Sequence, residues 1–218
     1  MTNKLIGIDE VMEHIKDGMT IMIGGFMGVG TPEPIIDAMV KKGVKDLTII
    51  ANDTGFPDKG IGKLIVNKQA KKVIASHIGL NPETGRQMNA KEIEVDLVPQ
   101  GTLAEQIRCG GAGIGGFLTE TGVGTIVEEG KEKIKVNDKE YLLELPLRAD
   151  IAIVGGSIVD KKGNTFYNGS TRNFNPLIAT AADMVIVGAE KLVEIGELNQ
   201  NHVMTPGIFV DYIVGGEN

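Results

Sequence analysis

The segment that suggests chemistry first is almost bare of polar side chains: it reads GGFMGVG, from Gly24 to Gly30. Glycine carries no Cβ, so a ligand can approach the backbone N–H groups of such a segment closely. Thr31 and Pro32 follow, and these residue types are typical of a helix N-cap and first helical position. Open amides and a helix N-terminus in one place predict a site for an anionic group.

Two familiar phosphate-binding patterns come close to this loop, and both fail on charge. Gly28 and Gly30 supply the first two glycines of G-x-G-x-x-G, but the third position is Glu33, whose carboxylate would oppose a phosphate. A P-loop requires Lys and then Ser or Thr after its last glycine, where this chain has Thr31-Pro32. Asp53 lies just past the next predicted strand, in the place of a ribose-binding acid, so a dinucleotide site stays open as an alternative.

The histidines and the cysteine give no spacing typical of a metal site, and we predict none. His14 and His202 fall in polar surroundings and are expected to be solvated. His77 ends a predicted strand and could face the site, although a hydrogen-bonded structural histidine is the simpler interpretation. Cys109 follows Arg108, but it also ends a predicted helix, where the helix dipole disfavours a thiolate, so we expect a buried, unreactive thiol.

Composition excludes several classes of protein. The 218 residues are 42% hydrophobic and 23% charged, as in ordinary globular proteins, and the formal net charge is −7. An acidic chain lacks the basic face that nucleic-acid binding needs. No apolar run reaches the roughly 18 residues of a membrane span. Acidic residues near the N-terminus and a single cysteine lead us to expect a cytoplasmic protein.

Strand-like and helix-like segments alternate along the chain. Apolar runs predict buried strands at Thr20–Ile23, Leu47–Ala51, Lys72–Ser76, Ile151–Val154 and Met184–Val187. Helical patterns lie between them, at Ile8–Lys16, Pro32–Lys42, Gly60–Asn67, Thr102–Cys109 and from Asn175-Pro176 onward. This alternation predicts an α/β fold with an open, mostly parallel sheet flanked by helices, in a single domain over residues 1–218.

Three segments depart from that alternation. Glu92–Val98 alternates apolar and acidic residues, which predicts an edge or half-exposed strand. Lys133–Val136 and Glu140–Leu145 flank Asn137-Asp138 and predict a hairpin. The glycine-rich stretch Gly110–Gly124 is either a mobile loop that orders against a partner chain or a plain surface loop.

Several further motifs accompany the glycine segment along the chain. The first group is Asp17-Gly18, Gly24-Gly25-Phe26, Gly28, Gly30 and Pro32, and the others are Asn52-Asp53-Thr54, Ser76-His77-Ile78-Gly79, Asn81-Pro82-Glu83-Thr84-Gly85, Pro99-Gln100-Gly101-Thr102, Arg108 to Gly116 and Arg172-Asn173-Phe174-Asn175-Pro176. The first group resembles the first signature of the family I coenzyme A transferases, and the others resemble the α subunits of acetate/butyrate–acetoacetate CoA-transferases. The similarity covers essentially the whole chain.

This resemblance implies a fold shared with sugar-phosphate isomerase-like proteins and an enzyme of α and β chains, expected as two of each. It also implies a ping-pong reaction through a glutamate of the β chain, with coenzyme A as a substrate and no tightly bound cofactor. Gln100 would donate a hydrogen bond to the developing oxyanion. The residues that would bind CoA and close the acyl pocket are Gly24, Gly25, Phe26, Met27, Gly28, Val29 and Gly30.

An uncharged amide donor suits such a reaction, because a cation beside the nucleophilic carboxylate would stabilise its resting form. Position alone would instead make Gln100 an ordinary polar residue of a strand-to-helix turn. Two other functions remain as alternatives at this point: a non-catalytic nucleotide or sugar-phosphate binding module, and an NAD-dependent oxidoreductase resting on Gly28, Gly30 and Asp53.

Overall fold

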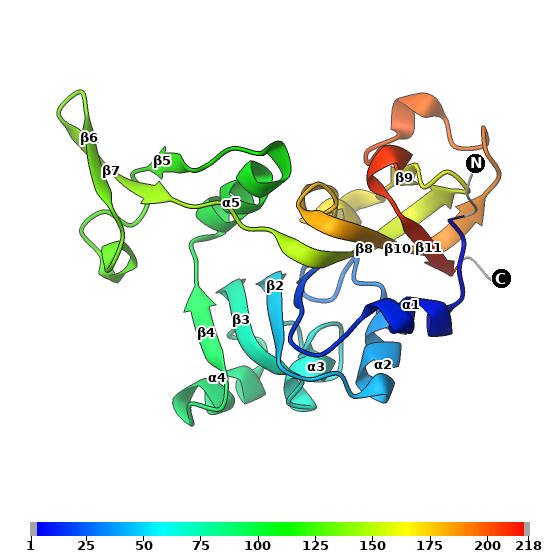
Figure 1. Ribbon diagram of the computed structural model, residues 1–218, viewed down its shortest axis with the longest axis horizontal. Coiled ribbons are helices and arrows are strands. Elements are labelled where there is room, and N and C mark those ends of the chain that lie inside the picture. The colour runs from blue at the N-terminus through cyan, green and yellow to red at the C-terminus, as the bar shows by residue number, and fades with distance from the viewer. Residues whose placement is uncertain (1–3, 216–218) are drawn as a thin grey trace.

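The computed structural model describes residues 4–215, and a parallel sheet with helices on both faces forms its body (Figure 1). Within these residues seven parallel strands lie in the order β11-β10-β8-β1-β2-β3-β4, and the short β9 pairs antiparallel with β8. The predicted α/β class and parallel sheet are confirmed. The strands of this sheet are β1 (Thr20–Ile23), β2 (Leu47–Asp53), β3 (Ala70–His77), β4 (Glu94–Leu97), β8 (Ala149–Asp160), β9 (Thr165–Phe166), β10 (Ala182–Val193) and β11 (Tyr212–Gly215).

Each face of the sheet has its own apolar core because consecutive strand residues point to opposite sides. In β1, Ile21 and Ile23 pack into the core under the first four helices, while Met22 packs into the core on the other face. The α-helices are α1 (Ile8–His14), α2 (Glu33–Lys42), α3 (Gly62–Val66), α4 (Pro82–Asn89), α5 (Gln100–Ala112) and α6 (Asn175–Ile178). The core on the α5–α6 side includes Leu103, Ile107 and Ile178, all fully buried.

A small antiparallel sheet projects from the body as an arm, at the left of Figure 1. It consists of β5 (Phe117–Thr119), β6 (Lys133–Val136) and β7 (Lys139–Glu144), in the order β5-β7-β6. The predicted hairpin is confirmed, and both turn residues, Asn137 and Asp138, have positive φ. At the base of the arm the buried Glu144 carboxylate accepts from Lys131 Nζ (2.6 Å) and from Gln106 Nε2 of α5 (2.9 Å).

Short 3₁₀ turns connect the remaining elements: Ile126–Glu128, Gly169–Arg172, Gln200–His202 and Gly207–Phe209. The last two lie in the outer segment 195–209, which is tied to the body through the buried Tyr167. Its hydroxyl lies 2.7 Å from the hydroxyl of Thr205. Burial raises the pKa of Tyr167 to about 12, so this hydroxyl stays protonated and able to donate.

The N-cap predicted at Thr31 is wrong. Helix α2 begins at Glu33 with Pro32 as N-cap, and the Thr31 hydroxyl donates to Gly24 O (2.9 Å) instead. Helix α5 begins at Gln100, two residues earlier than predicted, and runs on to Ala112. Thr102 lies buried inside its first turn. At Thr31 the hydrogen bond to Gly24 O outweighs the local capping signal.

The stretch Gly110–Gly124 is not one loop, because Gly110 to Ala112 close α5 and Phe117–Thr119 form β5. The edge position predicted for Glu92–Val98 is confirmed, since β4 ends the order of the sheet. Among residues 4–215 no helix is long and apolar enough to span a membrane.

Candidate active site

The glycine loop forms a tight hairpin at the carboxyl end of β1. The N–H groups of Phe26 and Val29 each donate to the other residue's carbonyl, at 3.0 and 2.9 Å. Between them, Met27 and Gly28 both have positive φ, 52° and 83°, which is the conformation of a type I′ turn. The side chains of Phe26, Met27 and Val29 are each about two-fifths exposed (42%, 39% and 45%), so the loop presents an apolar tip.

Two asparagines after β9 hold the flanks of this loop. Asn173 Oδ1 accepts from Gly25 N–H, and Asn173 Nδ2 donates to Val29 O, both at 3.0 Å. Asn175 Nδ2 donates to Gly30 O (3.0 Å), while its Oδ1 accepts from Gly155 N–H of β8 (2.9 Å). The Arg172 to Pro176 motif therefore fixes the shape of the glycine loop.

Asp53 supports the tip of the same loop from below. Its Oδ2 accepts from Met27 N–H and Asn52 Nδ2, both at 2.9 Å, and its Oδ1 accepts from Gly55 N–H at 2.8 Å. The side chain is buried, and both carboxylate oxygens are occupied. Asp53 is therefore not available to a ribose, and the dinucleotide alternative loses its acid.

Gln100 joins the same hydrogen-bonded group from α5. Its Nε2 donates to Asn52 Oδ1 at 2.8 Å, and Asn52 in turn donates to Asp53. The residue is exposed, as the first residue of α5. Among the described residues its amide makes this one hydrogen bond, so the second Nε2 hydrogen and the Oε1 have no partner there. The glycine loop follows β1, Asn52 and Asp53 end β2, and Gln100 begins α5 after β4, so these residues meet at the carboxyl ends of parallel strands.

The space beneath the hairpin is too small for a ligand. A hollow lined by Gly24, Gly25, Thr31 and Asp53 has room for about one water molecule at most, about 10 Å³. A ligand of this loop must therefore lie outside it, against the apolar tip and the Gln100 side.

The remaining candidates contribute little to this arrangement. His77 ends β3 with an exposed side chain, and no hydrogen bond among the described residues involves its ring, so the interpretation as a hydrogen-bonded histidine does not fit. His14 stacks on Tyr212 (ring centroids 4.9 Å apart), and so is less solvated than expected. Cys109 is fully buried, as predicted. Residues 4–215 hold no cluster of three potential metal ligands.

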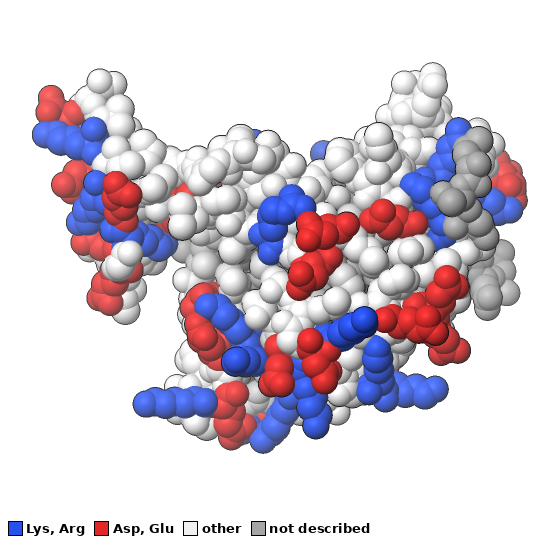
Figure 2. Space-filling view, in the orientation of Figure 1, with Lys and Arg blue, Asp and Glu red and all other residues white. Residues whose placement is uncertain are grey.

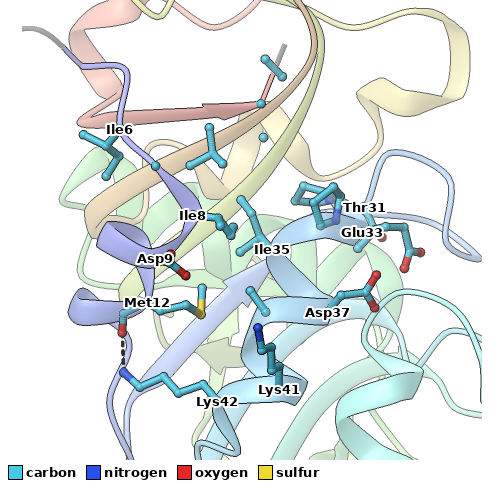
Figure 3. A pocket seen from close by; sticks show the side chains of 18 of the residues that line it. Ile6, Ile8, Asp9, Met12, Thr31, Glu33, Ile35, Asp37, Lys41 and Lys42 are labelled. Carbon is cyan, nitrogen blue, oxygen red and sulfur yellow. Dashed lines mark hydrogen bonds between the residues drawn. The ribbon is translucent and has the colours of Figure 1, made fainter. Parts of the chain in front are cut away.

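A much larger cavity, about 1050 Å³, lies on the other side of Thr31 and Pro32, between α1, α2 and the β10–β11 edge (Figure 3). Ile6, Ile8 and Ile35 form its apolar wall. Several of its charged groups have partners already: Glu33 and Asp37 pair with Lys63, and Lys42 donates to the Met12 and Ile15 carbonyls. The hydrogen-bonded group around Asp53 does not line this cavity.

The roles of Asn52, Asn173 and Asn175 were missed in the sequence. Each belongs to a motif that carries the family resemblance. In a single sequence, however, an asparagine that holds a loop cannot be distinguished from any other polar loop residue. For Asn52 one signal existed: it stands at the end of a buried strand, where a polar residue needs a partner.

Comparisons with known proteins agree along nearly the entire chain. A sequence profile described as coenzyme A transferase matches residues 6–216. The chain is 58% identical over 214 residues to "Acetate CoA-transferase subunit alpha" of Escherichia coli (strain K12), covering 98% of this chain and 97% of that protein. It is 57% identical over 214 residues to "Acetoacetyl-CoA:acetate/butyrate CoA transferase alpha subunit" of Clostridium acetobutylicum, covering 98% of each.

Solved structures agree on the fold. An acyl-CoA transferase of E. coli O157:H7, solved as a thioester complex with CoA, superposes with a TM-score of 0.86 at 22% identity. The match covers 99% of this chain but 49% of that one, so this chain spans about half the length of that chain. Glutaconate coenzyme A-transferase of Acidaminococcus fermentans gives a TM-score of 0.84 at 17% identity, over 97% of this chain and 75% of that one.

Proposed function

This chain belongs to the coenzyme A transferase family, and on that premise we propose that it is the α subunit of a two-component enzyme that exchanges CoA between a short-chain acyl-CoA and a free short-chain carboxylate. The substrate class follows the names of its relatives, which specify acetate, butyrate and acetoacetyl-CoA. The high identity of those relatives over the full chain favours this reaction over a non-catalytic binding module or an NAD-dependent oxidoreductase.

In the proposed reaction a glutamate of the partner β chain is the nucleophile. Its carboxylate attacks the carbonyl carbon of the acyl-CoA. The C–S bond breaks, CoA leaves as a thiolate, and an acyl-glutamyl anhydride is formed. The thiolate then attacks the glutamyl carbonyl, and the acyl group leaves as a free carboxylate. CoA is now held as a glutamyl thioester, and a second carboxylate reverses the two steps with its own acyl group.

The hydrogen bonds of Asp53 support the proposal that the nucleophile belongs to the other chain. Asp53 is the carboxylate of the hydrogen-bonded group at the loop, and a nucleophile needs a free oxygen lone pair directed at the substrate. Three N–H donors meet its two oxygens, and its side chain is buried. This chain therefore offers donors at the proposed site, while the attacking carboxylate is supplied by the partner.

Gln100 is the proposed oxyanion donor. Each attack converts a carbonyl into a tetrahedral oxyanion, and an amide N–H already fixed in place stabilises that charge without reorganising. One Nε2 hydrogen is held by Asn52, which fixes the direction of the other. The residues of the glycine loop, Gly24 to Gly30, are proposed to contact CoA and to close the acyl pocket with the apolar tip of Phe26, Met27 and Val29.

We propose that the β chain covers the hollowed, mostly uncharged upper margin visible in Figure 2, between the arm and the outer segment 195–209. Charged side chains crowd the lower part of that view instead. Large apolar side chains are exposed on both borders of the hollow, and such side chains are typical of a protein interface. They are Ile114, Leu118, Ile126, Val136 and Leu145 on and beside the arm, and Ile195, Met204, Ile208 and Phe209 in the outer segment.

Two copies of each chain are the expected assembly, and the cytoplasm is the proposed location, in keeping with one buried, unpaired cysteine.

Reconstitution tests the proposal. The purified chain alone should not exchange CoA between acetoacetyl-CoA and acetate, because it lacks the nucleophile. Adding the separately purified β chain should produce exchange, together with a larger species on gel filtration. Exchange by this chain alone, or none by the mixture that assembles, would contradict the proposal. Measurable NAD binding would instead support the oxidoreductase.

A further inference from the structure

The two proposed parts of the site are joined by one buried carboxylate. Asp53 accepts from Met27 N–H at the tip of the glycine loop, and it accepts from Asn52 Nδ2, whose Oδ1 in turn meets Gln100. Asn52 and Asp53 are 2% and 5% exposed, so water does not compete for the hydrogen bond between them. The backbone of Asn52 is held as well, since its carbonyl accepts from Ser76 Oγ of β3 at 2.7 Å.

This arrangement has a fixed polarity. A side-chain amide has a donor end and an acceptor end, and it can turn over to suit its neighbours. A carboxylate can only accept hydrogen bonds. The amide of Asn52 must therefore turn its donor end, Nδ2, toward Asp53. Its Oδ1 must then face Gln100, and only the Nε2 end of Gln100 can donate to it. The charge at Asp53 therefore decides which end of the Gln100 amide lies against Asn52.

We propose that Asp53 is a positioning residue for catalysis: it sets the orientation of the Gln100 amide through Asn52 and holds the tip of the glycine loop through Met27 N–H. Asp53 itself does not touch the substrate. The proposal rests on the function proposed above for Gln100 and the loop, and it adds that the two respond together to one buried side chain.

Asp53→Asn keeps the size of the side chain and removes one acceptor. The new amide offers one oxygen to three donors, so an NH2 group faces either Gly55 N–H or the pair formed by Met27 N–H and Asn52. In the second arrangement Asn52 turns over, Gln100 turns over after it, and the donor moves to the other side of the Gln100 amide. A misplacement of about 1 Å at the reacting centre can cost about 10²-fold in rate, so kcat is expected to fall by about that factor.

A double-mutant cycle in the assembled α–β enzyme separates positioning from general damage. Asp53→Asn, Gln100→Ala and the double variant are compared with the unmodified enzyme for kcat and for KM of the acyl-CoA. If Asp53 acts on turnover through Gln100, Asp53→Asn lowers kcat strongly in the unmodified enzyme and changes it little once Gln100 is alanine. In the arrangement that turns Asn52 over, the contact with Met27 N–H is lost as well, so the KM is expected to rise in both backgrounds.

Two further variants keep the test decisive if Asp53→Asn folds poorly. Asn52→Ala removes the link to Gln100 and leaves the bonds from Asp53 to Met27 and Gly55, so kcat is expected to fall with little change in KM. Asp160→Asn is the matched control: Asp160 is also buried and also accepts from three donors, Lys162 N–H, Asn164 N–H and Asn164 Nδ2, in a turn outside this hydrogen-bonded group. Its kcat is expected to match that of the unmodified enzyme.

The proposal would be overturned if the fold-loss of kcat in the double variant equalled the product of the fold-losses in the two single variants. An unchanged kcat for Asn52→Ala in a folded, assembled enzyme would overturn it as well. A different result identifies failure of the proposed function itself: the assembled, unmodified enzyme would then exchange no CoA. If the unmodified enzyme is active and the fold-losses of kcat are independent, the proposed function stands and Asp53 has no positioning role through Gln100.

Discussion

Replacing Gln100 by alanine is expected to lower kcat of the assembled enzyme by about 10²–10³-fold, the usual cost of a lost oxyanion donor. The donor acts on a charge that exists only in the transition state, so KM for the acyl-CoA should change far less than kcat. The fold should tolerate the change, because Gln100 is exposed at the first position of α5. Steady-state CoA exchange between acetoacetyl-CoA and acetate measures both constants.

Gln200→Ala is the matched control for this variant. Gln200 is also an exposed glutamine at the first position of a short helical element, Gln200–His202, but it lies in the outer segment. Because this segment borders the surface proposed for the β chain, assembly of the variant is checked first by gel filtration. The kcat of the assembled variant is expected to equal that of the unmodified enzyme. If Gln100→Ala turns over at the unmodified rate as well, Gln100 has a structural role only.

Gly30→Ala is expected to lower the free energy of unfolding strongly and to abolish exchange activity. Gly30 has φ 79°, where a side chain costs about 1–2 kcal/mol. A Cβ there would also lie 2.8 Å from the backbone carbonyl oxygen of Thr171, which cannot turn aside as a side chain can. Overlap in a packed region adds about 1–3 kcal/mol. The Asn173 and Asn175 clamps would have to shift, and the loop would shift with them.

Gly28→Ala separates the two contributions. Gly28 has a similar φ of 83°, but a Cβ there would meet only the Lys59 side chain, at 3.6 Å. This variant should therefore show the conformational cost without the overlap. Urea unfolding of both variants measures the difference. Equal free energies of unfolding for Gly28→Ala and Gly30→Ala would contradict the close packing of the loop against Thr171.

The centre of the sheet could be predicted from the sequence because its middle strands are buried on both faces. The run Ile21–Ile23 is apolar without interruption, and the structure has the strand Thr20–Ile23 with the predicted bounds. The predicted strands are shorter than the observed ones at β8 and β10, because glycines and polar residues continue the strand pairing beyond the apolar run. Helix α4 was missed, although Asn81 caps it and Pro82 opens it, because its apolar content is low.

The site was harder to predict than the sheet. The glycine spacing indicated where the loop lies, but the function of Asp53 depends on contacts over 26 positions in the chain, to Met27. Thr31 looked like a helix cap, and only the folded loop brings Gly24 O within its reach. Asn52, Asn173 and Asn175 act through hydrogen bonds between distant segments, which leave no periodic pattern in a single sequence.

In the proposed mechanism this chain positions the reacting groups and the partner β chain supplies the nucleophile. The most direct test is to mix the assembled enzyme with acetoacetyl-CoA, without an acceptor carboxylate, and to measure the mass of each chain. We expect a CoA adduct in thioester linkage to a glutamate of the β chain, and an unmodified mass for this chain. A CoA adduct on this chain would contradict this mechanism.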